Sequence, residues 1–238
     1  MKIALIGYGK MGKAIEEIAI ERGHSVNLKI TSANLEDFNE NKIQESDVAI
    51  EFTNPEVAYG NIKNCLNWHI PTVAGSTGWL EHKAEIEQLT KDTEGTFLYA
   101  SNFSIGVNLF FELNKYLAKL MALHKEYEVS LEEIHHTAKK DAPSGTAITL
   151  GEQVMQFISE KKHWVNEPSA NDSDLFIKSI RQDPAPGTHS ITYHSEIDDI
   201  EIIHTAHSRK GFALGAVLAA EFIAQKKGIF QMSDVLGL

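Results

Sequence analysis

The chain opens with a short apolar run that ends in three regularly spaced glycines. The run KIALI is typical of a buried strand, and Gly7, Gly9 and Gly12 follow it in the spacing GxGxxG before a helical pattern. In a βαβ unit the first glycine permits a tight turn, the second lets the backbone approach a pyrophosphate, and the third lets helix and strand pack closely. Because the helix N-terminus also presents free N–H groups to an anion, the spacing predicts a dinucleotide site. The other loop residues predicted to contact the nucleotide are Tyr8, Lys10 and Met11.

The first hundred residues alternate short apolar runs with segments of helical periodicity. This alternation is typical of a doubly wound α/β fold with a parallel sheet. Five strands are predicted, at residues 2–7, 25–30, 47–52, 71–75 and 96–100. The glycine-rich turn lies between the first strand and the first helix, as in a Rossmann-type dinucleotide-binding domain.

Two further segments follow predicted strands at the carboxyl edge of this sheet, where ligands of open α/β sheets bind. AGSTGW follows the fourth strand, and ASNFSIGVN follows the fifth. Their small side chains and backbone groups could line a nicotinamide pocket, although the second segment could also be a plain strand-to-helix connection. The residues predicted to contact the cofactor here are Gly75, Ser76, Thr77, Ala100, Ser101, Asn102 and Phe103.

The end of the second strand bears on the choice between NADH and NADPH. NAD-binding folds of this kind carry an Asp or Glu there that binds the ribose hydroxyls. This chain has LKITSAN instead, with no acid before Glu36. Lys10 and Lys29 could meet a 2'-phosphate, or they could be solvated lysines. The predicted cofactor is therefore NADPH, NADH or both.

The pattern changes after residue 105, which predicts a second domain. Its predicted elements are a long amphipathic helix at 105–123, a strand at 127–136, a helix at 145–159, an exposed loop at 159–174, and an antiparallel meander of runs at 176–181, 189–194 and 200–207. An Ala- and Leu-rich helix at 211–225 could return to cover the first sheet. The predicted domains are therefore residues 1–104 with 208–238, and residues 105–207.

The segment EEIHHTAKKDAPSGTA concentrates titratable side chains just before a predicted helix. In a strand that continues this far, Glu133 and His135 share one face and His136 lies on the other. A histidine is suited to general acid chemistry, and Lys139, four residues on, can anchor an anion or deliver a proton.

The turn that follows supplies a site for an anion. Ser144 can cap the helix, and Gly145 and Thr146 expose the N–H groups of its first turn, which favour a carboxylate. The segment therefore combines a proton donor with a site for a small acidic molecule, in a chain that also carries a dinucleotide motif.

Composition restricts the partners of the chain. A formal charge of -11 argues against a nucleic-acid binder, because such proteins need basic surfaces. No apolar run reaches the ~18 residues that span a bilayer, and the first apolar run is too short for a signal peptide. We therefore expect a cytoplasmic protein without nucleic-acid or membrane partners. Cys65 has no cysteine partner and is expected to be a small core residue.

Four alternative functions fit the sequence less well. A hydrolase triad of Ser144, His135 and Asp141 lacks the GxSxG elbow. A zinc site would need His135, His136, His204 and His207 to converge, and adjacent histidines on a strand diverge, so no metal is predicted. An aldehyde dehydrogenase needs a catalytic cysteine in the second domain, and a non-catalytic dinucleotide sensor leaves the histidine and lysine cluster without a task. Residues with no assigned role are His189 and His194, left outside the site, and His204, His207 and Arg209, which could line the site or be structural.

The motifs GYGKMG, GSTG, ASNFSIGVN, EIHHTAKKDAPSGTA and HTAHSR occur in the order found in one known family. Over nearly its whole length the chain resembles 4-hydroxy-tetrahydrodipicolinate reductase, also called dihydrodipicolinate reductase, of bacterial lysine and diaminopimelate biosynthesis. The phosphate loop departs from the commoner family form, with one residue fewer between its first two glycines and with Lys10 where arginine is usual.

The resemblance implies a fold, an assembly and a reaction. It implies an NAD(P)H-binding domain from both chain ends, a central α+β substrate domain with a mixed, largely antiparallel sheet, and a homotetramer assembled through that sheet. The implied substrate is a small cyclic imine dicarboxylate that loses its hydroxyl as water, takes a hydride and is protonated. By motif position, His135 is the implied proton donor and Lys139 its cationic partner. The substrate ligands expected beside them are His136, Ser144, Gly145 and Thr146.

Overall fold

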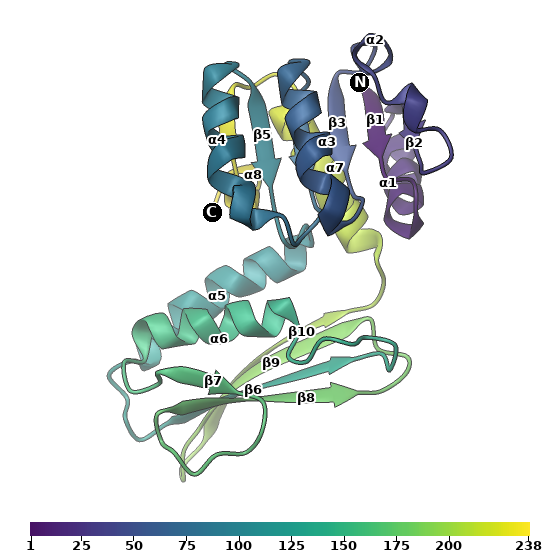
Figure 1. The fold of residues 1–238 in the computed structure, drawn as a ribbon. Coiled ribbons are helices and arrows are strands. Elements are labelled where there is room, and N and C mark those ends of the chain that lie inside the picture. Colours follow the sequence, from purple (N-terminus) through teal and green to yellow (C-terminus); the bar gives the residue numbers. More distant parts are fainter. The chain divides into compact units, whose positions relative to one another are not determined.

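The computed structural model describes residues 1–238, which form two compact units (Figure 1). One unit contains Met1–Ile105 and Arg209–Leu238, and the other contains Gly106–Ser208. The first unit is discontinuous in sequence, because the chain leaves it at α5 (Ile105–Met121) and returns to it at α7 (Lys210–Ile223). None of the helices combines the length and hydropathy needed to cross a bilayer.

The first unit is built on a six-stranded parallel sheet in the order β11-β5-β4-β3-β1-β2. Its strands are β1 (Lys2–Ile6), β2 (Ser25–Ile30), β3 (Val48–Glu51), β4 (Thr72–Ala74), β5 (Thr96–Tyr99) and β11 (Gly228–Phe230). Its other helices are α1 (Lys10–Glu21), α2 (Glu40–Ile43), α3 (Pro55–Asn67), α4 (Lys83–Asp92) and α8 (Met232–Leu236), with 3-10 turns at Leu35–Asp37 and Leu80–His82. The five predicted strands are confirmed. The sequence does not predict β11, because its three residues are too few to show a period.

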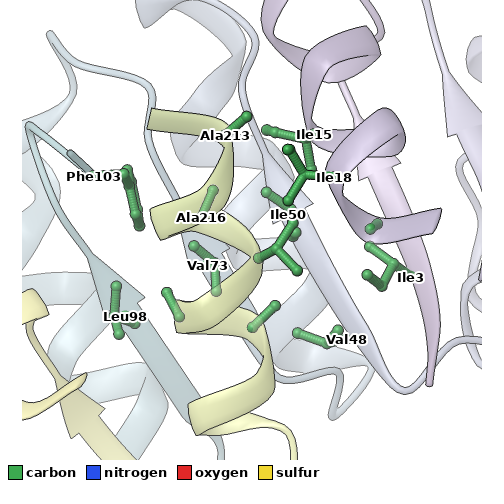
Figure 2. Close-up of a cluster of buried hydrophobic side chains, with 14 of the residues drawn as sticks. Ile3, Ile15, Ile18, Val48, Ile50, Val73, Leu98, Phe103, Ala213 and Ala216 are labelled. Carbon is green, nitrogen blue, oxygen red and sulfur yellow. The ribbon is translucent and has the colours of Figure 1, made fainter. Parts of the chain in front are cut away.

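Helices cover both faces of this sheet. On one face, α1 and α7 enclose a core with the strands, and Figure 2 shows side chains of both helices directed toward β1, β3 and β4. The labelled members of this core are Ile3, Ile15, Ile18, Val48, Ile50, Val73, Leu98, Phe103, Ala213 and Ala216. On the other face, α3 and α4 contribute Ile62, Leu66 and Ile86. The prediction that the last long helix returns to the first sheet is confirmed, and the sheet is doubly wound.

The second unit holds a five-stranded mixed sheet in the order β10-β9-β6-β8-β7. Its strands are β6 (Glu128–His135), β7 (His163–Val165), β8 (Asp174–Arg181), β9 (Gly187–His194) and β10 (Asp199–Ala206). The β6–β9 and β9–β10 pairs are antiparallel, and the β6–β8 and β7–β8 pairs are parallel. Helices α5 and α6 (Gly145–Phe157) lie on the same side of this sheet (Figure 1).

Two expectations for this sheet are wrong. The runs at 176–181 and 189–194 do not form neighbouring strands of a meander, because the central strand β6 lies between β8 and β9 and pairs with both. The segment 159–174 is not wholly a loop, since β7 adds a short parallel strand beside β8. Both differences arise from pairing between segments far apart in sequence, which local turn signals do not encode.

The alternation of β6 places a polar end on an otherwise apolar face. Val129 and Leu131 point into the core beneath α5 and α6, which includes Phe110, Leu150 and Tyr193. The next two residues on the same face of β6 are polar, and both are buried. The core of the second unit therefore ends at a buried polar cluster.

Candidate active site

A row of polar side chains crosses the helix-covered face of the second sheet. In register, Glu133 of β6 lies opposite Ser179 of β8 and His189 of β9. His189 in turn lies opposite His204 of β10. His135 follows two residues after Glu133, on the same face of β6, so the expected pairing of these two residues on one face is confirmed. Glu133 is fully buried, and His135 and His189 are 8% and 5% exposed.

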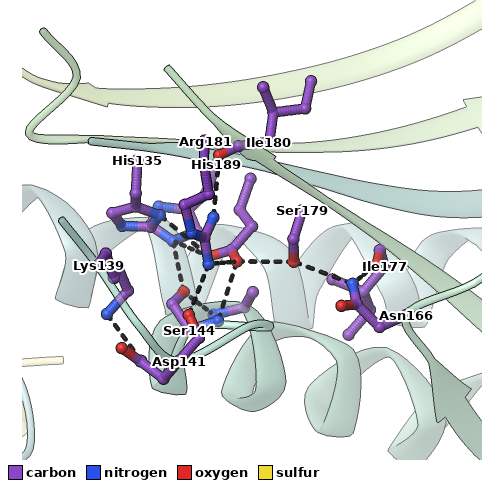
Figure 3. Close-up of polar contacts among 12 residues, drawn as sticks. His135, Lys139, Asp141, Ser144, Asn166, Ile177, Ser179, Ile180, Arg181 and His189 are labelled. Atoms are coloured by element: carbon purple, nitrogen blue, oxygen red, sulfur yellow. Dashed lines mark hydrogen bonds and ion pairs between the residues drawn. The ribbon is translucent and has the colours of Figure 1, made fainter. Parts of the chain in front are cut away.

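Each carboxylate oxygen of Glu133 has its own set of neighbours. Oε1 accepts hydrogen bonds from the backbone N–H of Ser144 at 3.0 Å, from the Ser179 hydroxyl at 2.8 Å and from Arg181 Nη2 at 3.0 Å. Oε2 lies 3.1 Å from His135 Nδ1 and 3.9 Å from His189 Nε2, without hydrogen-bond geometry to either. Figure 3 shows these partners converging from β6, β8, β9 and the start of α6.

These neighbours keep Glu133 ionised. Burial by itself raises the pKa of the Glu133 carboxyl, but contacts with His135, Ser144, Ser179 and Arg181 outweigh burial and hold that pKa well below its ordinary value. For His189 burial has the opposite consequence, because it disfavours the imidazolium and lowers the pKa of His189 to about 3. A neutral His189 therefore lies next to an ionised Glu133.

Ser144 links His189 to α6. Its Oγ accepts a hydrogen bond from the N–H of Ala147 at 3.2 Å, which is the N-cap contact expected of it, and lies 3.2 Å from His189 Nε2. The hydrolase arrangement is not present, because the histidine beside Ser144 is His189 and the nearest carboxylate, Glu133, approaches the same Nε2 atom. A triad needs its carboxylate at Nδ1, which here is buried without a partner.

The two residues expected to be catalytic lie on either side of the end of β6. His135 is the last residue of the strand, and its ring packs edge-on against the ring of His189 with centroids 5.1 Å apart. Lys139 lies in the following loop, where its Nζ is 2.7 Å from Asp141 Oδ2. His136 is half-buried, and its backbone N–H donates to Ala185 O at 2.8 Å. Because the strand ends at His135, alternation does not determine the direction of His136.

The N-terminus of α6 has room for an anion. Gly145, its first residue, is exposed, and no heavy atom lies within 4 Å of where a Cβ would stand. The first turn carries no acidic residue. Thr146 follows and is half-buried. The backbone of this turn, preceded by the Ser144 cap, therefore suits the carboxylate cradle predicted for it.

The buried cluster also has the donor atoms of a metal site. Glu133, His135 and His189 each offer one ligand atom, all within 4.8 Å of one another. This is a different set from the four histidines considered from the sequence. The charge balance argues against a cation here, because Arg181 already neutralises Glu133 through a direct hydrogen bond.

The glycine-rich loop of the first unit fits a dinucleotide. Gly7 has φ +96°, and a Cβ there would lie 2.1 Å from Phe52 O, while a Cβ on Gly12 would lie 2.4 Å from Gly7 O. Gly9 is exposed, is the N-cap of α1 and makes no side-chain cap, and the first turn of α1 carries no acid. The structure thus keeps the backbone close and the helix N-terminus open to an anion. Lys10 is exposed, and Met11 packs against the core.

Tyr8 and Lys29 both contact Glu16 of α1. The Tyr8 hydroxyl donates to Glu16 Oε2, and Lys29 Nζ lies 2.5 Å from Glu16 Oε1. The same ammonium lies 5.0 Å from the centroid of the Tyr8 ring. Lys29 is therefore placed beside the phosphate loop, but its charge is paired with Glu16.

A buried carboxylate joins the loop after β4, which is predicted to contact the cofactor, to the loop after β3. Glu51, the last residue of β3, is fully buried. Its Oε1 accepts hydrogen bonds from the backbone N–H of Thr53 at 3.0 Å, from the Thr53 hydroxyl and from Ser76 Oγ at 2.9 Å. The loops after β3 and β4 are thus held together at the carboxyl edge of the sheet.

The remaining predicted cofactor residues differ in exposure. A Cβ at Gly75 would lie 2.2 Å from the Phe52 ring, so that ring would have to move for any other residue. Ser101 and Thr77 are exposed. Ala100 donates its N–H to Ala74 O at 3.2 Å, and Asn102 Oδ1 accepts from the N–H of Ser104 at 2.9 Å. Phe103 is 2% exposed and packs against Phe52, so its side chain belongs to the core.

Comparison with known proteins identifies the family. The family described as "Dihydrodipicolinate reductase, N-terminus" matches residues 1–103, and "Dihydrodipicolinate reductase, C-terminus" matches residues 106–236. The chain belongs to the dihydrodipicolinate reductase family. Its first unit is accordingly the dinucleotide-binding part of an oxidoreductase that uses a nicotinamide cofactor.

Individual members of the dihydrodipicolinate reductase family are similar over their full length. A 4-hydroxy-tetrahydrodipicolinate reductase of Christiangramia forsetii is 49% identical over 99% of this chain and 98% of its own length. The enzyme of that name from Methanosarcina mazei is 32% identical over 99% and 89%. A dipicolinate-bound dihydrodipicolinate reductase structure from Paenisporosarcina sp. TG-14 superposes with a TM-score of 0.78, covering 97% of both chains at 21% identity. This superposition shows that the fold is the same.

Several polar residues of the buried cluster around Glu133 are not predicted from the sequence. Ser179 and Arg181 lie on a run treated as an ordinary strand, and His189 is left outside the predicted site. Glu133 is placed on the His135 face but given no role. The signal available for Glu133 was a glutamate on the buried face of an amphipathic strand, which is costly unless paired.

Proposed function

We propose that this chain catalyses the NAD(P)H-dependent reduction of 4-hydroxy-tetrahydrodipicolinate to tetrahydrodipicolinate with loss of water, in lysine and diaminopimelate biosynthesis. The observation that carries the proposal is the match, over almost the whole chain, to a relative of that name at 49% identity. The overall change adds one hydride and one proton to the substrate and releases one water.

His135 and Lys139 are the proposed catalytic residues. NAD(P)H, when bound, supplies the hydride. His135 donates the proton, and the buried carboxylate of Glu133 lies 3.1 Å from its Nδ1. Lys139 adds positive charge that would attract a substrate carboxylate, and its ion pair with Asp141 would exchange for that anion. This exchange makes Lys139 available only when substrate is bound.

The first turn of α6 is the proposed substrate anchor. A small dicarboxylate needs hydrogen-bond donors for its oxygens, and the backbone N–H groups of Gly145 and Thr146 at the helix N-terminus supply them. Ser144 fixes the start of that turn. His136, next to the proton donor, would supply a further contact to the substrate.

For the cofactor, we propose that the glycine-rich loop holds the pyrophosphate and that NADPH and NADH are both accepted. No acid follows β2 before Glu36, so the carboxylate that binds the ribose hydroxyls in NAD-specific folds is missing there, while the charge of Lys29 is paired with Glu16. The residues proposed to line the nicotinamide side are Gly75, Ser76, Thr77, Ala100, Ser101 and Asn102, with Phe103 supporting them from the core.

We also propose a cytoplasmic homotetramer that binds neither nucleic acid nor membrane. The net charge of -11 supports the absence of nucleic-acid partners. Exposed apolar side chains on β10, among them Ile203 at 57% exposed, support assembly through the second sheet. Light scattering coupled to size-exclusion chromatography tests the assembly, since a monomer of 26.5 kDa would contradict it.

The deciding experiment follows NAD(P)H absorbance with enzymatically generated 4-hydroxy-tetrahydrodipicolinate. We expect the wild type to oxidise cofactor, and His135→Ala and Lys139→Ala to lose roughly a hundredfold or more in kcat while still binding nucleotide. Lys140→Ala is the matched control, because Lys140 is the exposed neighbour of Lys139. A wild type that binds nucleotide without turnover would replace the reductase by a dinucleotide sensor.

A further inference from the structure

One buried carboxylate, that of Glu133, contacts both parts of the proposed active site. Its Oε2 lies 3.1 Å from Nδ1 of the proposed proton donor, His135. Its Oε1 accepts the backbone N–H of Ser144, the residue that caps α6. No part of the proposed reaction assigns a task to this carboxylate.

The residues around Glu133 keep its carboxylate ionised and fix its position. It is fully buried, so it has lost its hydration, and an isolated carboxylate there would take up a proton instead. Arg181 Nη2 and the Ser179 hydroxyl replace that hydration at Oε1 from the neighbouring strand β8. The same Arg181 nitrogen also donates to Asp141 O at 2.6 Å, so β8 is connected to the loop between Lys139 and Ser144.

The contact at Oε2 fixes which ring nitrogen of His135 can serve the substrate. A carboxylate beside Nδ1 favours a proton on Nδ1 and leaves Nε2 for the opposite side of the ring. At Nε2 the neighbouring residue is Gly187, where a Cβ would lie 2.9 Å away. Glycine at this position leaves room beside Nε2 that any other side chain would fill. A carboxylate therefore lies beside Nδ1 of His135, and a residue without a side chain lies beside Nε2.

The contact at Oε1 fixes the other part of the site. Ser144 donates its N–H to Glu133 and uses its Oγ to cap Ala147 and contact His189. A displacement of Glu133 would therefore shift the first turn of α6 relative to the ring of His135. Glu133 therefore contacts both the proposed proton donor and the residue that caps the proposed anion site.

We propose that Glu133 is a positioning residue that holds the His135 ring and the N-terminal turn of α6 in register for the reaction. The inference rests on the proposed function and deepens it, because it assigns the geometry of that site to a residue outside it. The charged and titratable groups of this cluster are Glu133 on the strand of His135, Arg181 on β8, His189 on β9, and Lys139 and Asp141 in the loop. Glu133 Oε2 lies 3.1 Å from His135 Nδ1.

The test compares Glu133→Gln with Glu132→Gln. Gln at 133 keeps the size and an acceptor oxygen but removes the negative charge beside His135. We expect kcat to fall on the order of tenfold to a hundredfold and the KM for the substrate to rise, because the proton donor and the first turn of α6 both lose their alignment. Glu132 lies on the opposite face of β6 and pairs with Lys178 at 2.7 Å, so Glu132→Gln removes a comparable ion pair and should leave both quantities unchanged.

Further measurements separate positioning from mere stability. The nucleotide dissociation constant should stay the same in Glu133→Gln, and Glu133→Asp should recover kcat only in part. A lower melting temperature with unchanged kcat and KM would overturn the proposal. If Glu133→Gln does not fold, Ser179→Ala removes one hydrogen bond to the same oxygen; kcat should fall about threefold, and an unchanged kcat would likewise overturn it. A wild type without turnover would instead refute the reductase function itself.

Discussion

Ser76 Oγ donates a hydrogen bond to the buried Oε1 of Glu51 at 2.9 Å, which ties the loop after β4 to the end of β3. The Ser76 hydroxyl oxygen also accepts the N–H of Thr53 at 2.8 Å. Glu51 Oε2 is buried without a hydrogen-bond partner. The carboxyl edge of the sheet is thus held together by a carboxyl group with one oxygen hydrogen-bonded and the other without a partner.

This arrangement predicts a stability that falls as pH rises. Burial raises the pKa of Glu51 above its ordinary value of 4.5, although hydrogen bonds from Thr53 and Ser76 oppose that shift. The folded state then binds the proton of Glu51 more tightly than the unfolded chain does. The contribution of Glu51 to stability is therefore complete below about pH 4.5 and is lost as pH rises through the folded pKa. Glu51→Gln should flatten this decline in urea unfolding between pH 5 and 8. Glu81→Gln, which changes an exposed glutamate, should leave the decline as it is in the wild type. Parallel plots of unfolding free energy against pH for wild type and Glu51→Gln would refute the prediction.

His189 predicts the opposite dependence on pH. Because burial lowers its pKa from 6.5 to about 3, the folded state binds fewer protons than the unfolded chain between these values. Its contribution is complete above pH 6.5 and is lost as pH falls, amounting to about 2 kcal/mol between pH 7 and pH 5. His189→Gln keeps a polar group near Ser144. Between pH 7 and pH 5 its free energy of unfolding should therefore fall by about 2 kcal/mol less than that of the wild type. Chemical denaturation at both pH values measures it, with the exposed His163→Gln as control.

The Rossmann-type unit is the part of the fold that sequence predicts best. Each of its first five strands carries a local signal, an apolar run followed by a turn, and the GxGxxG spacing marks the first βα turn. The period of two in β6 similarly predicts that Glu133 and His135 share a face. These inferences hold because they need information from only a few neighbouring residues.

The partners of Glu133 could not be predicted in this way. Ser179 and His189 reach it because β6 pairs with β8 on one side and β9 on the other, in a register set by burial across the whole sheet. The sequence order of the strands favours a meander instead, which would separate these side chains. The proposed proton donor can therefore be predicted from one segment of the sequence, whereas the residues that contact it cannot.

Nucleotide preference should respond to the pairing of Lys29 with Glu16. In the structure Glu16 neutralises an ammonium that lies beside the phosphate loop. Glu16→Gln would free that charge for a 2'-phosphate, so the KM for NADPH should fall about threefold to tenfold while that for NADH changes little. Glu17→Gln removes the comparable pair with Lys210 on the exposed side of α1 and serves as control. Equal changes for both nucleotides would show that Lys29 does not reach the 2' position.

Activity should not depend on a bound metal, although Glu133, His135 and His189 could supply three ligands. Oε1 of Glu133 already accepts three hydrogen bonds, one from the Arg181 guanidinium, so a divalent cation would enter a site whose carboxylate charge is already compensated. We expect dialysis against EDTA to leave kcat and KM unchanged, and stoichiometric Zn²⁺ added afterwards not to raise activity. The purified protein should also contain less than about one metal per ten chains by elemental analysis, a threshold far below a stoichiometric structural or catalytic site. Loss of activity in EDTA with recovery on adding one equivalent of metal would instead make the cluster a catalytic metal centre, and His189→Gln would then abolish that recovery.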